Sequence, residues 1–287
     1  MLLEQVVNGL GQGAIYALMS IGYAMIFGVI GLVTFAHGDV IMIGAFTAFY
    51  SFLLFGNHVL VAILAGFVVS GLLGFVIHRV CYNKFFNSPR QISLICTIGM
   101  GIFLRNLVQV FAGAESKPIP STFASGSVIV AGLRITYMQM FIFSVVICIV
   151  TLLTLFLKKT RIGLSLKAVS MDKTASSLLG INTRKTTTLG NMIGCAIAGA
   201  AGVLLAMYYS TVSPMMGGTI GMKSFCCAVL GGMASISGAA VGGLLIGVAE
   251  NVGIMVLGAG FRDIISFVFL ILVLLVKPEG LFVRRSR

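Results

Sequence analysis

Charged residues are scarce in this chain, and most of those present are basic. Only 9% of its 287 residues are charged, with seven Asp and Glu against nineteen Lys and Arg. A soluble domain of this length needs a much larger charged surface, so a water-soluble globular protein is excluded. No Gly-Lys dipeptide occurs anywhere in the sequence, which excludes a P-loop for nucleotide phosphates. Energy from nucleotide hydrolysis would therefore have to come from another chain.

Long apolar runs fill most of the chain instead. Hydrophobic residues make up 59% of it, and the mean hydropathy is +1.11. Runs of about 17–25 apolar residues are long enough to cross a hydrocarbon core of about 30 Å as helices. We therefore expect an all-α, polytopic transmembrane helical bundle, with residues 1–287 in one transmembrane domain. The expected spans are 9–30, 38–55, 58–79, 92–112, 137–157, 186–209, 219–232, 238–257 and 263–277.

The expected number of spans is nine, with eight and ten as alternatives. The segments 38–55 and 219–232 are the least certain spans, since either could be a broken or re-entrant helix that lines a cavity. Small residues recur every four positions, as in Gly194, Ala198 and Gly202, which lets helices approach closely in a membrane. We expect this spacing to serve packing within one bundle, with a subunit interface as the alternative.

The basic residues cluster in segments that this topology places on one side. Between Lys158 and Lys185, seven bases accompany a single acid, Asp172, and short Lys/Arg-rich loops stay in the cytoplasm. These residues, three bases at 79–90 and four at 277–287 make up 14 of the 19 bases. The net charge of +12 thus follows from topology, without nucleic acid as a partner. We expect an outside N-terminus, a cytoplasmic C-terminus and a retained first span, not a signal peptide.

The cytoplasmic loop 158–185 is too long to be a simple turn. Asp172 is suited to cap the start of a short helix and Gly180 to close it. Apolar residues follow helical spacing through the loop, which predicts an amphipathic helix parallel to the membrane. Such a helix could dock a cytoplasmic protein or rest on the headgroups of membrane lipid. The apolar positions are Leu164, Ala168, Met171, Ala175, Leu178 and Leu179.

Residues for catalysis or metal binding do not form a recognisable set. His37, His58 and His78 are far apart, and the six cysteines include no CxxC pair. We therefore expect no catalytic, cofactor-binding or metal-binding residues, and no enzyme. The sequence Phe35-Ala-His-Gly-Asp39 interrupts two apolar runs. It indicates either a broken helix along a transport pathway, or a cap in which Thr34 or His37 ends one span and Asp39 begins the next.

Three charged residues fall inside expected spans: Arg105, Lys223 and Glu250. An unpaired charge at such depth costs at least about 2–3 kcal/mol. We therefore expect Glu250 to pair with Lys223 or Arg105, while snorkelling of the bases is the alternative.

Four stretches resemble the LivH-type permease subunit of the branched-chain amino-acid importer family, which belongs to the ATP-binding-cassette transporters. They occur in the family's order, and the resemblance extends over residues 8–282. The stretches are Arg161–Asn182, Gly31–Gly44, Ala228–Ala239 and Asp263–Val276.

The resemblance implies a subunit of the bacterial cytoplasmic (inner) membrane that moves leucine, isoleucine or valine inward. Its implied partners are a second related permease, two cytoplasmic ATPases that bind ATP and Mg, and an extracytoplasmic substrate-binding protein. The loop helix would be the coupling helix that contacts an ATPase. Its implied coupling residues are Arg161, Gly163, Lys167, Ala168, Asp172, Ala175, Leu178, Leu179 and Gly180.

The substrate path should have an apolar, weakly binding wall, because transport requires release as well as entry. Residues at Gly-rich breaks and their neighbours are the candidates: His37, Gly38, Gly99, Tyr208, Ser213, Phe225, Gly231 and Gly232. Two functional alternatives stay open. One is the same importer class with urea, short amides or aromatic acids as cargo, and the other is an ATP-independent channel or carrier. A non-transporting scaffold fits the broken helices less well.

Overall fold

The computed structural model describes residues 2–85, 89–119, 126–130, 133–277 and 280–282. Helices dominate this part of the chain. A π-helical turn, His78–Asn83, extends α3, and a 3-10 turn, Ala259–Phe261, precedes α11. The α-helices are α1 Leu2–Ile30, α2 His37–Phe55, α3 Val59–Ile77, α4 Arg90–Ala112, α5 Tyr137–Lys159, α6 Arg161–Met171, α7 Lys173–Leu178, α8 Thr183–Tyr209, α9 Met216–Gly231, α10 Ile236–Leu257 and α11 Arg262–Val276.

The expected helical membrane bundle is confirmed. Each of the nine expected spans coincides with a helix, and seven of these, in the described part, are long and apolar enough to cross a membrane. The other two are α9, with 16 residues, and α11, with 15. The largest boundary error is at α1, which begins at Leu2 and not at residue 9, because the apolar pattern continues around Glu4 and Gln5.

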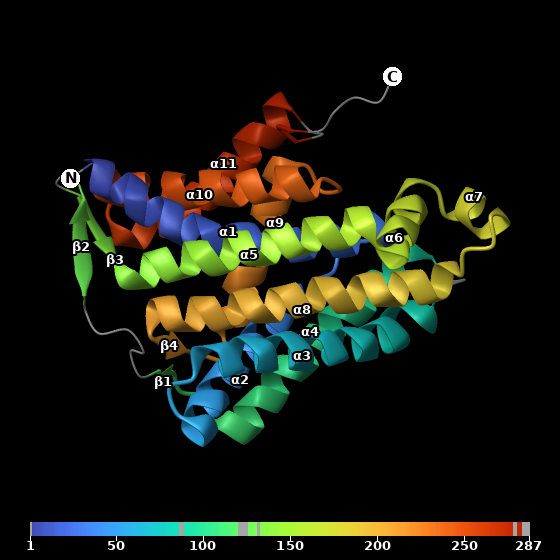
Figure 1. Cartoon of the computed structure of the whole chain (residues 1–287), viewed down its shortest axis with the longest axis horizontal. Coiled ribbons are helices and arrows are strands. Elements are labelled where there is room, and N and C mark those ends of the chain that lie inside the picture. Colours follow the sequence, from blue (N-terminus) through green and yellow to red (C-terminus); the bar gives the residue numbers. More distant parts are fainter. Residues whose placement is uncertain (1, 86–88, 120–125, 131–132, 278–279, 283–287) are drawn as a thin grey trace.

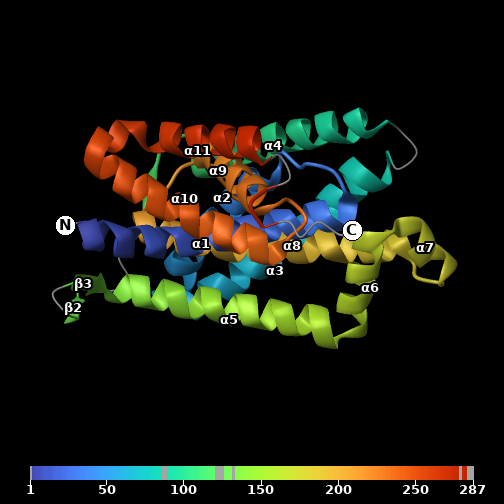
Figure 2. The same cartoon turned by 90° about the horizontal axis from the view of Figure 1, so that it is seen from above.

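The long helices run roughly along one axis of the molecule (Figures 1 and 2). The N-terminal end of α1 lies at one end of this axis, beside the hairpin of β2 Ser127–Val130 and β3 Leu133–Thr136. Helices α6 and α7 lie at the opposite end, where α6 runs across the ends of the long helices (Figure 2). A second small antiparallel pair joins β1 Lys117–Pro118 to β4 Thr211–Val212.

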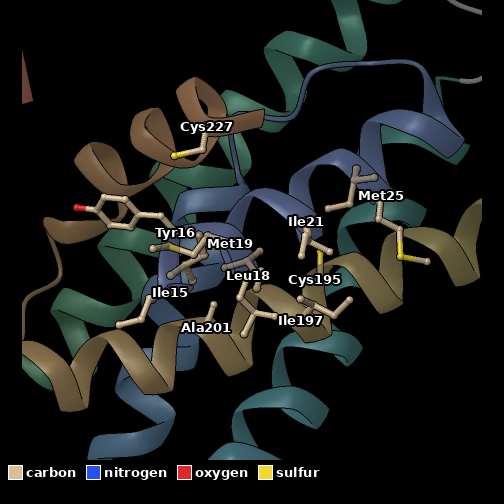
Figure 3. Packing of buried hydrophobic residues seen from close by; sticks show 14 of the residues in the cluster. Ile15, Tyr16, Leu18, Met19, Ile21, Met25, Cys195, Ile197, Ala201 and Cys227 are labelled. Atoms are coloured by element: carbon tan, nitrogen blue, oxygen red, sulfur yellow. The ribbon is translucent and has the colours of Figure 1, made fainter. Parts of the chain in front are cut away.

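Helices α1 and α8 form the centre of the bundle and are buried through most of their length, whereas α4 and α5 are mostly exposed. Large apolar side chains of α1, among them Ile15, Leu18 and Met19, pack against Ile197 and Ala201 of α8 (Figure 3). An exposed apolar surface is normal for a helix that faces lipid, so the outer helices are suited to a bilayer.

Small residues allow the close helix contacts, as their spacing predicts. A Cβ on Gly243 would overlap with the backbone of Ala17, and a Cβ on Gly194 would overlap with the side chain of Ile26. These are contacts within one chain, which confirms the packing interpretation for these positions. The first span ends at Ile30, before Gly31 with its φ of +75°, so neither Thr34 nor His37 ends it. That part of the cap interpretation was wrong. The positive φ of Gly31 ends the helix at Ile30, four residues before Thr34.

Candidate functional site

Lys223 and Glu250 form an ion pair inside the bundle, near the end that holds the N-terminus. Lys223 lies in α9 and Glu250 in α10, and Nζ is 2.8 Å from Oε1. The Lys223 side chain is 7% exposed and the Glu250 side chain is fully buried. The same Nζ also lies 2.8 Å from Oδ1 of Asp263, whose side chain is 52% exposed. The predicted ion pair of Glu250 is therefore confirmed, and Lys223 is the partner.

Glu250 accepts hydrogen bonds from three further groups. Gln12 Nε2 and Tyr16 Oη donate to Oε2 at 3.0 and 2.9 Å, and the Ser266 hydroxyl donates to Oε1. Gln12 and Tyr16 are four residues apart on α1, so both point from one face of that helix toward α10. Buried charges are tolerated only when such partners replace water. The network therefore fixes Glu250 between three helices.

Arg262 joins the same network from the first residue of α11. Its Nη1 donates to Tyr209 Oη at 3.2 Å, and its Nη2 donates to Gln12 Oε1 at 3.1 Å. Its Nε is 3.6 Å from Glu250 Oε2, an ion-pair contact that is too long for a hydrogen bond. Two cations, Lys223 and Arg262, thus accompany two carboxylates, Glu250 and Asp263, and their formal charges cancel.

A pocket of about 250 Å³ opens beside this network. Lys223, Arg262 and Asp263 form its charged end. Its other lining residues are hydroxyl-bearing or apolar side chains: Tyr16, Leu205, Tyr209, Thr211, Ser213, Met216, Thr219 and Ile220. An apolar cavity with a few convergent polar groups is the usual form of a small-molecule site. This pocket is the candidate functional site.

Arg105 pairs elsewhere, with Asp39. Its Nε and Nη2 donate to Asp39 Oδ1, each at 3.1 Å, and connect α4 to the first turn of α2. The alternative in which Glu250 pairs with Arg105 was wrong, because α4 lies on the α2 side of the bundle. Asp39 lies in the first turn of α2, near the positive end of the dipole, as the cap interpretation predicts, but the helix begins at His37 and no side chain of the described residues caps it.

The residues that the sequence suggests for the substrate path do not gather in one place. Ser213 lines the pocket, and the ring of Tyr208 lies 5.3 Å from that of Tyr209, which also lines it. His37 and Phe225 both pack against Tyr23 in the protein core, with their ring centroids 5.1 and 5.7 Å from that of Tyr23. The remaining candidates are glycines: Gly38 packs on Gly217, Gly99 lies on an exposed face of α4, Gly231 packs on Gly238, and Gly232 ends α9.

The basic loop, residues 158–185, forms two helices, α6 and α7, and not one continuous amphipathic helix. Asp172 ends α6 in an extended conformation, and its carboxylate then accepts from the backbone of Thr174 and Ala175 to cap α7. Gly180 follows α7 with a φ of +82°, so both predicted caps are confirmed. The expected single apolar face was wrong, because a capping side chain at Asp172 breaks the helix.

The implied coupling residues lie mostly on the surface of this loop. The side chains of Leu178 and Leu179 are 83% and 81% exposed. The buried apolar side chains of this loop are instead Leu166 and Val169, which pack α6 against the bundle. Gly163 is buried and packs on Leu157, and Ala168 is half-buried. The exposed members are Arg161, Lys167, Asp172, Ala175, Leu178, Leu179 and Gly180.

Six residues of the network are not among the sequence candidates: Gln12, Tyr16, Tyr209, Arg262, Asp263 and Ser266. A signal exists for two of them, since Gln12 and Tyr16 are polar groups four residues apart in an apolar run. Arg262 and Asp263 stand at the start of a span, where interfacial charges are common, so the sequence does not distinguish them.

The chain resembles transport proteins over nearly its whole length. A family model described as "Branched-chain amino acid transport system / permease component" matches residues 5–276. The high-affinity branched-chain amino acid transport system permease protein BraD of Pseudomonas aeruginosa is 42% identical over 294 residues, which cover 98% of this chain and 96% of BraD.

Two further relatives show how widely the similarity extends. The permease protein LivH of Salmonella typhimurium is 42% identical over 297 residues, with 98% of this chain and 96% of LivH covered. A probable branched-chain amino acid transport permease protein LivH of Methanocaldococcus jannaschii is 26% identical over 278 residues, with 92% and 87% covered. No solved structure matches the chain.

Proposed function

Because this chain belongs to the family of branched-chain amino acid transport system permease components, we propose that it is the membrane-spanning subunit of an ATP-driven importer for leucine, isoleucine and valine. The observation that carries this proposal is the full-length similarity to permease proteins of such transport systems. The subunit moves its cargo without converting it chemically, so it is not an enzyme.

The energy comes from partner subunits. This chain lacks the Gly-Lys dipeptide of a P-loop, so two cytoplasmic ATPases bind ATP and Mg²⁺ in its place. The exposed residues of α6 and α7, with their bases and two adjacent leucines, are suited to contact an ATPase. A second related permease completes the pathway, and an extracytoplasmic binding protein delivers the amino acid.

The protein is a multi-pass membrane protein, and we place it in the bacterial inner membrane with the N-terminus outside. The basic loop at α6 and α7 supports this orientation, because Lys/Arg-rich loops stay in the cytoplasm. The N-terminal end of α1 lies at the opposite end of the bundle (Figure 1). The bases Arg284, Arg285 and Arg287, which also support it, lie outside the described residues.

Reconstitution in liposomes tests the function. The complete set of subunits, with the binding protein outside and ATP inside, should accumulate radiolabelled leucine, and omission of the ATPases should abolish uptake. Uptake by this chain alone would show a channel or carrier. Uptake of urea, short amides or aromatic acids in preference to leucine would show a different cargo within the same importer class.

A further inference from the structure

The pocket beside the ion network combines a charged end with an apolar wall. Lys223, Arg262 and Asp263 lie at the charged end, while Leu205, Met216 and Ile220 form much of the wall. Its volume of about 250 Å³ lies just below the range of about 300–1,000 Å³ that is typical of pockets for drug-sized ligands. The pocket is therefore suited to a small molecule with one charged and one aliphatic end.

The charged end has a fixed part and an accessible part. Glu250 is fully buried and is held by Gln12, Tyr16 and Ser266, so it stays in place. Asp263, by contrast, is half exposed, and it shares Lys223 Nζ with Glu250 at equal distances of 2.8 Å. The Lys223–Asp263 contact is thus the one that a molecule in the pocket could replace.

Arg262 adds a second cation at the same end. Its Nε is buried and faces Glu250 Oε2 at 3.6 Å, while its Nη1 and Nη2 bind Tyr209 and Gln12. A carboxylate that approaches Lys223 from the pocket could also pair with this guanidinium, since the Arg262 side chain is 30% exposed. Arginine is well suited to bind carboxylates through charge-assisted hydrogen bonds.

On the premise of the proposed function, we infer that this pocket binds the transported amino acid as a zwitterion during its passage. The α-carboxylate pairs with Lys223 and Arg262, the α-ammonium group pairs with Asp263, and the branched side chain lies along Leu205, Met216 and Ile220. Insertion replaces the Lys223–Asp263 ion pair by three pairs, with Lys223, Arg262 and Asp263, and leaves no charge unpaired. A ligand with only a carboxylate would take Lys223 from Asp263 and give Asp263 no cation in return, and a ligand with only an ammonium group would leave Lys223 with Glu250 alone.

This arrangement also explains how the amino acid could leave again. The ligand must displace the existing Lys223–Asp263 contact, so part of its binding energy is lost and the affinity stays low. Low affinity suits a pathway in which the cargo is bound only briefly, because a site that is too strong would retain it.

Protection of an introduced cysteine tests the inference in the complete transporter complex in nanodiscs without the binding protein. Ser213→Cys places a thiol in the pocket, and its rate of reaction with a water-soluble maleimide is compared with the wild-type background. Asn57→Cys, in the exposed turn between α2 and α3, is the matched control outside the pocket. The probes are leucine, 4-methylpentanoate, which lacks the ammonium group, and 3-methylbutylamine, which lacks the carboxylate.

Millimolar leucine is expected to slow labelling of Ser213→Cys several-fold, whereas the two analogues and the Asn57→Cys control show no change. Adding Asp263→Asn should abolish the protection, and adding Glu115→Gln, at an exposed carboxylate outside the pocket, should leave it intact.

Equal protection by an analogue, protection that survives Asp263→Asn, or a Ser213→Cys thiol that does not react without leucine would each overturn the inference. ATP-driven leucine uptake by the complete wild-type system separates the two proposals: uptake without protection refutes only this site, and absent uptake refutes the function.

Discussion

Gly38 of α2 and Gly217 of α9 are in direct backbone contact, and a methyl group on Gly38 would overlap with the carbonyl oxygen of Gly217. The contact brings α9 against the first turn of α2, where Asp39 binds Arg105. A Cβ on Gly217 would in turn overlap with the Asp39 carboxylate. The Gly38–Gly217 contact, which only glycine permits, therefore holds α9 against the first turn of α2, and the Asp39–Arg105 pair holds α4 at the same place.

Gly38→Ala is expected to destabilise the bundle. The added methyl group meets backbone atoms that cannot rotate away, and overpacking of this kind costs about 1–3 kcal/mol, occasionally more. Gly28→Ala is the matched control, because its Cβ would find its nearest neighbour, Ala234 O, at 3.9 Å. Thermal unfolding of both variants in detergent measures the difference, and equal stability of the two would contradict the close contact.

Glu250→Ala should be strongly destabilising. It removes the acceptor of Lys223, Gln12, Tyr16 and Ser266 at a fully buried position. Loss of one partner of a buried ion pair costs about 3–5 kcal/mol. The double variant Glu250→Ala with Lys223→Met should recover part of this loss, since the buried amine of Lys223 would otherwise keep only the half-exposed carboxylate of Asp263. Unfolding in detergent measures both, and a double variant less stable than Glu250→Ala would argue against the pair.

Leu178→Asp with Leu179→Asp is expected to abolish binding of the ATPases while the bundle stays folded. Both side chains are more than four-fifths exposed in the isolated chain, so their replacement removes no internal contact of note. The measurement is co-purification of the ATPases, together with the unfolding temperature of the chain. Asn57→Asp, at the opposite end of the bundle, is the control. Normal co-purification of the double variant would show that α7 does not form the contact.

The proposed orientation, with the N-terminus outside, predicts which introduced thiols an impermeant reagent reaches in intact cells. Asn57→Cys, between α2 and α3, should be labelled from outside, and Ser177→Cys, an exposed position in α7, only after the cells are opened. The reverse pattern would place the basic loop outside and would remove the basis for ATPase coupling.

Much of the helix content could be predicted from the sequence, because a bilayer imposes a local rule. A segment must be long and apolar enough to cross it, and this depends on neighbouring residues alone. The caps in the basic loop 158–185 are local too, since the Asp172 carboxylate accepts hydrogen bonds from backbone groups two and three residues away. For the same reason, the start of a helix after Asp172 could be predicted from the sequence.

The amino-acid sequence alone thus determined the membrane class, the approximate ends of the spans, the caps at Asp172 and Gly180, and the need for a partner to Glu250. Only the tertiary structure decided which residues meet. Arg105 and Asp39 are 66 residues apart, and Gln12 and Glu250 are 238 residues apart. Their contacts depend on which helices lie side by side and how each is rotated. Those relations arise from the packing of the whole bundle, so no single stretch of sequence carries them.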